Sequence, residues 1–366
     1  MYSLLRNILF LFNAEEVHYF SMFCLKVLYR IEFVREAIAN KFTPPQNVTN
    51  FCGLRFRNPV GLGAGFDKNA KYLSELEMLG FGFIEIGTVT PLPQKGNSKP
   101  RLFRLPKDKA LINRMGFNND GAKVISARLK AWRENKQDLY QKEDTGLANH
   151  TSRMLIGGNL GKNKNTPNNE AWKDYEAVFL ELFDHVDYFV INVSSPNTPG
   201  LRELQDKDHL QTILQNLQRI NKSRSAPKPL LVKIAPDLDK KQLDGLISIA
   251  IELNLDGIVA TNTTISRANL VTNPFSVRRK GTGGLSGQPL SLVSTEIIQY
   301  INEQTSGKIG IIGSGGIFNG EDALEKINAG AGLLQVWTGF VYEGPAIIKR
   351  ICNYLTKTSL DNPKQI

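Results

Sequence analysis

From residue 58 onward, short apolar runs alternate with amphipathic stretches along the chain. Eight of the runs have the length and composition of buried strands, and they are residues 59–65, 83–89, 154–159, 188–193, 229–235, 257–262, 309–315 and 333–339. The amphipathic stretches predict helices at residues 71–80, 169–184, 205–221, 239–254, 320–329 and 343–355. Eight strand–helix units in series predict an α/β fold of the (β/α)8 TIM-barrel class, with an open doubly wound sheet as the alternative.

Motifs that would favour the open sheet or a serine hydrolase are missing. In the stretch GLGAGF, Phe66 stands where the third glycine of a dinucleotide-binding fingerprint would fall, and Ser286 stands there in GTGGLS. The stretch GLSGQ ends in Gln288, so it does not form the G-x-S-x-G elbow of serine hydrolases. The missing fingerprint favours the barrel over the doubly wound sheet.

The first 41 residues have a different pattern and predict an N-terminal helical extension to a barrel domain at 42–366. Helical patterns cover about 3–12 and 15–40, and the second sets seven apolar residues on one side: Val17, Phe20, Cys24, Val27, Leu28, Ile31 and Val34. The longest clean apolar run, ILFLF, is too short to span a bilayer or to form a signal-peptide core. The helices therefore either pack on the barrel or lie in a membrane interface, and composition leaves both open.

Composition describes a soluble, core-forming protein with a basic surface. The 366 residues are 41% hydrophobic and 22% charged, with a net charge of +10. The basic residues are scattered and not interleaved with aromatic residues, which favours a solvated surface over nucleic-acid binding. The three cysteines lie far apart and predict neither disulfides nor a metal site. Residues 1–41 carry a net charge of only +1, so any lipid contact there would depend on apolar burial.

Polar residues or glycines stand at the end of every predicted strand. They are Asp67, Lys68, Thr88, Asn159, Asn192, Lys233, Thr261, Asn262, Gly315, Gly316 and Thr338. Because the carboxyl ends of barrel strands converge on the face that carries the active site, this set predicts a ligand site. Any one of these residues alone is explained as well by turn or cap chemistry.

The turns after the last two predicted strands predict a phosphate site. GSGGI (313–317) and WTGF (337–340) both precede helices, and backbone N–H groups at such turns bind phosphate in barrels. A sugar phosphate, a nucleotide or flavin mononucleotide (FMN) would each fit. Lys233 lies inside an apolar strand and needs a negative partner, which the anionic reduced form of a flavin would provide. A structural ion pair with a strand carboxylate such as Glu85 is the alternative.

With these residues assigned, the chain closely resembles the class 2 dihydroorotate dehydrogenases, which are quinone-dependent and membrane-associated. The resemblance runs from the N-terminus to about Ile351. The segments that carry it are GAGFDKN, IEIGTVTPLPQKGNSKPRLFRL, LINRMGFNN, GNLGKNKNTP, NVSSPNTPGLREL, VKIAPDL, ATNTT, GGLSGQPL, IIGSGGI and TGFVYEGP. Residues 132–153 are longer than the family pattern implies and predict a surface insertion.

This resemblance implies oxidation of (S)-dihydroorotate to orotate on FMN, with a membrane quinone as electron acceptor. The reaction is the fourth step of pyrimidine synthesis. The resemblance also implies a peripheral protein on the lipid surface at the cytoplasmic face of the cell (inner) membrane, with no nucleic-acid partner. The sequence leaves the oligomeric state open, and a monomer is the default expectation.

Roles for individual residues follow from the same resemblance. Ser195 matches the catalytic base, with Thr198 as its proton-relay partner and Phe117 beside the substrate, whereas the soluble class 1 relatives have cysteine at the serine position. The residues implied for FMN are Ala64, Gly65, Phe66, Asp67, Lys68, Thr88, Asn159, Asn192, Lys233, Thr261, Gly287, Gly315, Gly316, Trp337 and Thr338. Those implied for the substrate are Lys68, Asn113, Arg114, Met115, Gly116, Phe117, Asn192, Asn197, Asn262 and Thr263. Those implied for the quinone are His18, Phe20, Arg104 and Trp337.

One departure from the family pattern concerns the quinone end of the site. Trp337 stands where the pattern has tyrosine. Tryptophan keeps an N–H donor but moves it and adds bulk. The resemblance therefore predicts the orotate contacts more closely than the quinone contacts.

Overall fold

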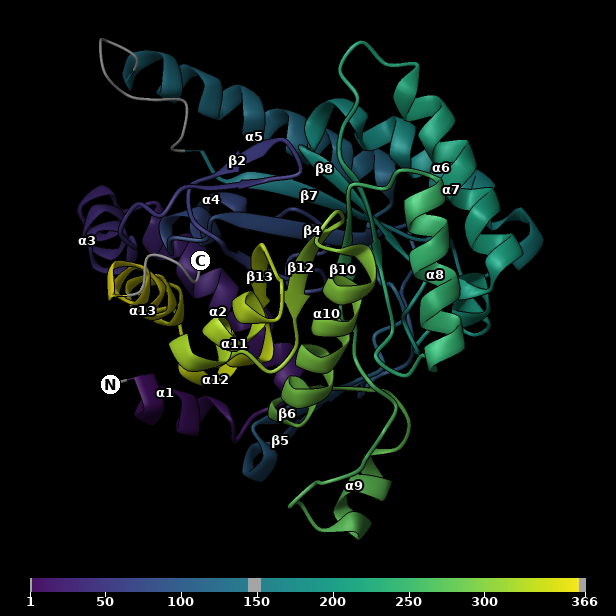
Figure 1. The fold of residues 1–366 in the computed structure, drawn as a ribbon. Helices are drawn as coiled ribbons and strands as arrows, with labels where there is room; N and C mark the ends of the chain where they lie inside the picture. Colours follow the sequence, from purple (N-terminus) through teal and green to yellow (C-terminus); the bar gives the residue numbers. More distant parts are fainter. Residues whose placement is uncertain (1, 144–152, 362–366) are drawn as a thin grey trace.

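The predicted barrel is present in the computed structural model of the chain, which describes residues 2–143 and 153–361. Eight parallel strands close it in the order β10–β12–β13–β3–β4–β7–β8–β9 (Figure 1). The strands are β3 Val60–Leu62, β4 Phe83–Val89, β7 Leu155–Leu160, β8 Tyr188–Asn192, β9 Leu230–Lys233, β10 Gly257–Ala260, β12 Gly310–Ser314 and β13 Leu333–Val336. Each overlaps one of the eight predicted runs, so the predicted fold class is confirmed.

Helices cover the outside of the barrel and follow the strands in the chain. They are α4 Leu73–Met78, α5 Ala122–Glu143, α6 Ala171–Leu182, α7 Lys207–Lys222, α8 Lys240–Glu252, α10 Ser291–Thr305, α11 Gly320–Asn328, α12 Thr338–Glu343 and α13 Ile347–Asp361. Helix α7 illustrates why they form: Leu210, Ile213 and Leu217 are buried at helical spacing while the opposite face carries charged residues. The apolar stripe of each helix packs on the outward side chains of the strands.

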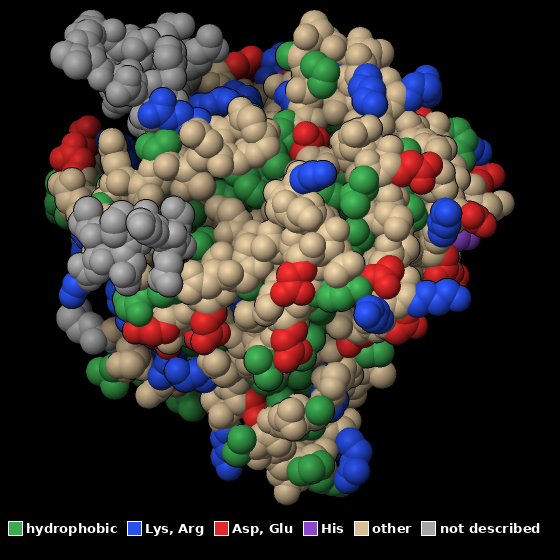
Figure 2. Space-filling view, viewed as in Figure 1, with side chains coloured by type: hydrophobic (Ala, Val, Ile, Leu, Met, Phe, Trp, Pro, Cys, Tyr) green, Lys and Arg blue, Asp and Glu red, His purple; other side chains and the backbone are tan. Residues whose placement is uncertain are grey.

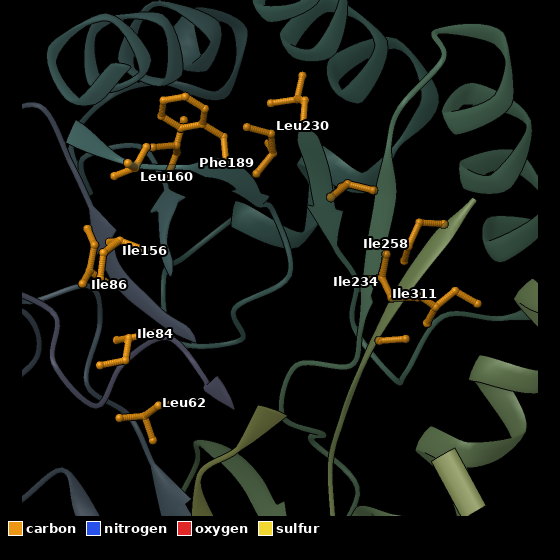
Figure 3. Packing of buried hydrophobic residues seen from close by; sticks show 14 of the residues in the cluster. Leu62, Ile84, Ile86, Ile156, Leu160, Phe189, Leu230, Ile234, Ile258 and Ile311 are labelled. Atoms are coloured by element: carbon orange, nitrogen blue, oxygen red, sulfur yellow. The ribbon is translucent and has the colours of Figure 1, made fainter. Parts of the chain in front are cut away.

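Side chains alternate between the two faces of each strand, as a period of two residues requires. On β4, Ile84 and Ile86 belong to the large apolar cluster that joins strands and helices, shown in Figure 3 with residues of the neighbouring strands. Phe83 belongs instead to the cluster inside the barrel. By the same alternation, Glu85 points into the barrel interior. The barrel therefore has an apolar outer layer and an interior whose character changes along the strands.

Bulky apolar side chains fill the interior at the end away from the strand exits. The cluster contains Phe51, Phe56, Phe83, Leu155, Tyr188, Val190, Leu231, Val259, Ile312 and Leu333. The hairpin of β1 Thr49–Phe51 and β2 Leu54–Phe56 closes this end, and the Phe56 ring lies 5.3 Å from that of Phe83. The closed end leaves the opposite face, at the strand exits, as the place for a ligand.

A second, smaller sheet lies at the strand exits. It contains β5 Leu102–Leu105, β6 Ala110–Asn113 and β11 Gly284–Gly287, all antiparallel in the order β11–β6–β5. Helix α9, Pro274–Lys280, projects from the barrel beyond this sheet (Figure 1). The small sheet packs through Leu105, Ile112 and Leu285 and forms a rigid rim at the open end of the barrel.

Three helices precede the barrel: α1 Tyr2–Leu9, α2 Ala14–Tyr29 and α3 Glu32–Phe42. The prediction of one continuous helical segment over 15–40 is therefore wrong, because the chain turns at Arg30 and Ile31. A straight helix over that range would extend about 39 Å. The turn instead lets α2 pack on β5 and α4 while α3 packs on α4.

Most large apolar side chains of this extension face away from the barrel. Phe23 is 63% exposed and Phe33 is 74% exposed, whereas Met22 is buried. Among the residues that the structure describes, no helix is long and apolar enough to cross a membrane. The predicted apolar stripe on α2 thus lies mainly on the outer side of the helix, with Phe20, Val27 and Leu28 exposed.

The stretch 132–153, predicted to be a surface insertion, begins as part of a helix. Residues 132–143 continue α5, where Trp132 Nε1 donates to Ser74 Oγ over 3.0 Å and Arg133 pairs with Asp187 at 3.1 Å. Residues 144–152 lie outside the described residues. The insertion itself stays a prediction.

Charged side chains are spread over the surface. Acidic and basic groups are interspersed on the face drawn in Figure 2, without a broad patch of one sign. Exposed pairs such as Lys173–Glu170 bring opposite charges together. Such pairs contribute little to stability, so the fold depends on the apolar layers.

We expect Phe83→Ala to destabilise the protein by about 3–5 kcal/mol, because it opens a cavity among aromatic rings that cannot collapse. Phe275→Ala, at a position that is 62% exposed on α9, is the matched control and should leave the unfolding midpoint almost unchanged. Denaturant unfolding of both variants measures the difference. Equal stability of the two variants would contradict the packing described for the barrel interior.

Candidate active site

A cavity of about 750 Å³ opens where the strand exits converge. Its walls come from the strand exits, the small sheet and helix α2. The predicted residues that line it are His18, Ala64, Gly65, Phe66, Asp67, Lys68, Thr88, Asn113, Met115, Gly116, Phe117, Asn192, Ser195, Asn197, Lys233, Thr261, Asn262, Thr263, Gly287, Gly315, Gly316, Trp337 and Thr338. The predicted residues that do not line it are Phe20, Arg104, Arg114, Asn159 and Thr198. The structure thus brings most of the predicted residues together in one cavity.

Beneath the cavity, the uppermost interior layer of the barrel is polar. We call this layer the polar floor, and it contains Glu85, Asn159, Asn192, Lys233 and Gln335. Asn159 Nδ2 donates to Glu85 Oε1 over 2.7 Å, and Gln335 Nε2 donates to Glu85 Oε2. Lys233 Nζ lies 3.7 Å from Glu85 Oε1. The ion pair considered as an alternative for Lys233 is therefore present, although Lys233 also lines the cavity.

The floor continues into a hydrogen-bonded set of asparagines. Asn192 Nδ2 donates to Asn159 Oδ1 over 3.1 Å, and Asn262 Nδ2 donates to Asn192 Oδ1 over 3.3 Å. At the rim, Asn197 Nδ2 donates to Asn113 Oδ1 over 3.0 Å. Each amide keeps further donor or acceptor capacity, which is the chemistry that an imide edge of a ligand requires.

The NVSSPNTPGLREL stretch follows β8 and carries the predicted base. Ser195 is buried, lines the cavity and accepts the backbone N–H of Asn197 at Oγ over 3.3 Å. Thr198 is also buried, and its Oγ1 has no hydrogen-bond partner among the described residues. A hydroxyl buried without a partner is unusual, so Thr198 retains full capacity to accept or donate.

The turn after β12 has the backbone required for a phosphate cradle. Gly315 and Gly316 have φ angles of +128° and +71°, and a Cβ on Gly316 would come within 2.5 Å of Ser291. Within the described part of the chain, no hydrogen bond uses the amide N–H of either glycine. Helix α12 follows the next strand, β13, and its first N–H groups also lack intrahelical partners, as at any helix start. These donors could hold an anionic group.

Two charged residues follow β3. Asp67 accepts the backbone N–H groups of Lys71 and Tyr72 at 2.9 and 2.8 Å, so its carboxylate holds a turn. Burial raises the pKa of Asp67 to about 6, and these hydrogen bonds oppose the shift. Lys68 Nζ donates to Asn118 Oδ1 over 2.6 Å. Burial, with a smaller contribution from the charge of Arg101, lowers the pKa of Lys68 to about 7.

Helix α2 forms one wall of the cavity and is fixed by a buried ion pair. Arg101 donates to both carboxylate oxygens of Glu15, from Nε at 3.0 Å and from Nη2 at 2.7 Å. Burial alone would raise the pKa of Glu15, but the hydrogen bonds and charge of Arg101 outweigh it and the pKa lies below its usual value. One turn further along α2, burial lowers the pKa of His18 to about 4, so the imidazole is neutral near pH 7.

Three residues predicted to bind the substrate or the quinone have side chains that do not line the cavity. Arg104 donates from Nη1 to the backbone oxygen of Phe12 over 2.6 Å, so it holds the α1–α2 connection. Arg114 donates to the backbone oxygen of Thr282 and stacks on Phe103, away from the cavity. Phe20 is 59% exposed on the outer side of α2. Exposed and backbone-bound positions of this kind cannot be read from a motif alone.

Several residues of the site were not predicted. Gln335 belongs to the polar floor, and Glu15, Tyr19 and Arg101 build or hold the wall of the cavity. Gln335 had a usable signal, because a polar residue at the inward register of the apolar strand LLQV resembles Lys233 in LLVK. Glu15 had none, since an acidic residue in the first helical turn is ordinarily a solvated charge.

Known proteins match both the sequence and this geometry. Residues 47–358 match the family model described as dihydroorotate dehydrogenase. The dihydroorotate dehydrogenase (quinone) of Christiangramia forsetii is 51% identical over 351 residues, which cover 95% of this chain and 96% of the relative. The chain belongs to the quinone-dependent dihydroorotate dehydrogenases.

Other members of the family agree. The enzyme of the same name from Cellvibrio japonicus is 44% identical over 352 residues, covering 95% of this chain and 96% of the relative. The crystal structure of DHODH from Eimeria tenella in complex with ferulenol superposes with a TM-score of 0.79 at 37% identity, covering 91% of this chain and 92% of that one. The predicted family and enzyme class are confirmed, and a flavin is the cofactor of the family.

The pKa of Lys68 predicts how orotate affinity depends on pH. If Lys68 pairs with the ligand carboxylate, as the family resemblance implies, the charged ammonium present below about pH 7 attracts it. Above that pH, binding requires uptake of a proton, so affinity should fall by up to about tenfold per pH unit. Titrating the flavin absorbance with orotate between about pH 6 and pH 8 measures this linkage.

Lys68→Met is the control for this titration. It should weaken binding at the lowest pH and remove the pH dependence. An affinity that stays constant over this range in the unmodified protein would contradict the assignment of Lys68 to the ligand carboxylate.

Proposed function

We propose that this chain oxidises (S)-dihydroorotate to orotate at the cavity above the polar floor, using bound FMN, and passes the electrons to a membrane quinone. The observation that carries the proposal is the meeting of a buried serine, paired asparagines and a glycine cradle in one cavity. Each part suits one portion of the reaction. The serine suits proton removal, the amides suit an imide ring, and the cradle suits a phosphate.

The residues present fit FMN. The free amides of Gly315 and Gly316 and the start of α12 suit its phosphate, and Lys233 at the floor suits the polar edge of its ring. The cavity volume of about 750 Å³ leaves room for a substrate beside it. When bound, FMN supplies the acceptor for the hydride that leaves C6 of the substrate.

Ser195 removes the proton from C5. A neutral serine is a weak base, so it needs an acceptor for its own hydroxyl proton as the new one arrives. Thr198 Oγ1 is buried nearby in the same stretch without a partner, and we assign it that relay role. The proton goes to Ser195, and the hydride, which carries both electrons, would go to the bound flavin, so no covalent enzyme intermediate is needed.

The asparagines orient the substrate. Two amide pairs offer donors and acceptors on two sides of the cavity: Asn113 with Asn197 at the rim, and Asn192 of the polar floor with Asn262 next to it. Lys68 supplies the cation for the substrate carboxylate. Removing a single amide should cost about 1–3 kcal/mol of orotate affinity, because a polar group of the ligand is left unpaired.

In this proposal, the N-terminal helices place the cavity at the membrane, so that a quinone can reach the flavin and collect its electrons. His18 and Tyr19 of α2 line the same cavity as Trp337, so the cavity reaches from the barrel to the helical extension. The extension exposes apolar side chains on its outer side, with Leu4 of α1 69% exposed and Leu11 of the α1–α2 turn 82% exposed. Helices of this kind lie in the interface of a bilayer, here the cytoplasmic face of the cell membrane, and a quinone would enter between them and the barrel.

Replacing Ser195 by alanine should leave FMN bound and orotate affinity little changed, while flavin reduction by dihydroorotate slows by roughly 10²–10⁴. Stopped-flow absorbance of the flavin gives the rate. Ser195→Cys should keep part of the activity with a changed pH profile. A near-normal reduction rate in Ser195→Ala would exclude Ser195 as the base.

The pair Phe23→Ser and Phe33→Ser should release the protein from lipid vesicles, because each buried Phe contributes about 1.5–3 kcal/mol. Flavin reduction by dihydroorotate should be unaffected, while reoxidation by a long-tailed quinone in vesicles slows. Phe275→Ser, equally exposed but on α9, is the control and should stay bound. Release by salt alone, with no effect of the Phe substitutions, would contradict apolar anchoring.

A further inference from the structure

The polar floor contains one residue to which no step of the proposed reaction assigns a role. Glu85 has no exposed surface, does not line the cavity and lies in the layer directly beneath it. Interior layers of a barrel are ordinarily filled by bulky apolar side chains, as in the lower cluster of this one. A carboxylate in such a layer is costly unless it is fully compensated.

The compensation of Glu85 is specific. Both oxygens accept amide hydrogens, Oε1 from Asn159 and Oε2 from Gln335. The one cation near it, among the described residues, is Lys233 at 3.7 Å from Oε1. The amides are neutral, so the charge of Glu85 is balanced by Lys233, and the charge of Lys233 is balanced by Glu85.

These contacts also fix which way the amides face. Because Asn159 gives its N–H to Glu85, its Oδ1 is left to accept from Thr88 and from Asn192. Asn192 in turn accepts from Asn262 at the cavity. If Glu85 donated a hydrogen bond to Asn159 instead of accepting one, the Asn159 amide would have to turn over. The amides of Asn192 and Asn262 would then have to turn over as well, and these two residues line the cavity.

We infer that Glu85 is a positioning residue that orients the polar floor and, by offsetting the charge of Lys233, lowers the reduction potential of the bound cofactor. The inference rests on the proposed function, since it takes the cofactor to be a flavin above Lys233. A reduced flavin is anionic at its pyrimidine end, so a fully uncompensated lysine would favour the reduced form. With Glu85 present, Lys233 can still contact the ring edge, but the reduced flavin is stabilised less. This suits an enzyme that must pass the electrons on to a quinone.

The test is the midpoint potential of the flavin in Glu85→Gln, measured anaerobically against redox dyes at one pH. The substitution keeps the size and removes the negative charge, but it turns one acceptor oxygen into an amide donor. Gln335 can accept this donor by turning over its amide, because its Oε1 has no partner among the described residues. We expect the reduced form to be favoured at least tenfold more than in the unmodified protein, an upward shift of about 30 mV for a two-electron couple. An unchanged or lower potential with FMN stoichiometrically bound would overturn the inference.

Two controls separate charge at the floor from general effects. Asp187→Asn removes a buried carboxylate at the start of β8, at the opposite end of the barrel, and should leave the potential unchanged. Gln335→Met removes a hydrogen bond of the floor without changing charge, and should shift the potential by less than half as much as Glu85→Gln. An equal shift in either control would assign the effect to packing and overturn the inference.

A further variant covers loss of the cofactor in Glu85→Gln. Glu85→Asp keeps the negative charge but moves it away from Lys233 by the length of one methylene. This variant should bind FMN, and its midpoint potential should rise by less than that of Glu85→Gln. A downward shift or none would contradict the inference. The unmodified protein separates the two proposals. If it holds no FMN or is not reduced by dihydroorotate, the proposed function fails. If it binds FMN and is reduced by dihydroorotate, but the variants have unchanged midpoint potentials, only the role of Glu85 fails.

Discussion

The buried charge of Glu85 is the constraint on which the upper half of this barrel depends. A carboxylate without solvent must be matched by donors and a cation, or the fold loses several kcal/mol. Asn159, Gln335 and Lys233 provide them from three other strands, and the resulting polar floor ends the apolar interior. A cavity with a polar floor can therefore open directly above a closely packed core.

A second buried pair, Glu15 with Arg101, fixes the other boundary of the site. It ties the first turn of α2 to the loop before β5, so the N-terminal extension becomes a wall of the cavity as well as an exposed apolar surface. The same helix thus faces the cavity with neutral, half-buried His18 and faces outward with Phe23. The proposed path from substrate to quinone needs both sides of this helix.

The sequence predicts the barrel well because the period of its apolar runs is set by strand geometry, and strand exits necessarily meet on one face. The sequence predicts fewer of the contacts made by residues at the edge of the site. Arg104 and Arg114 belong to family segments, yet their guanidinium groups bind backbone oxygens that no linear motif reveals. Helical spacing continues through the turn at Arg30, so the sequence pattern does not show it, although the turn lets both α2 and α3 pack on α4.

In the function proposed above, one cavity joins dihydroorotate, flavin and quinone. An anaerobic absorbance titration of the purified protein follows all three in one experiment. We expect a yellow protein with one FMN per chain, whose absorbance is bleached by stoichiometric dihydroorotate and restored by a long-tailed quinone supplied in vesicles. A colourless protein would contradict the proposed function. So would a flavin that dithionite bleaches and dihydroorotate does not.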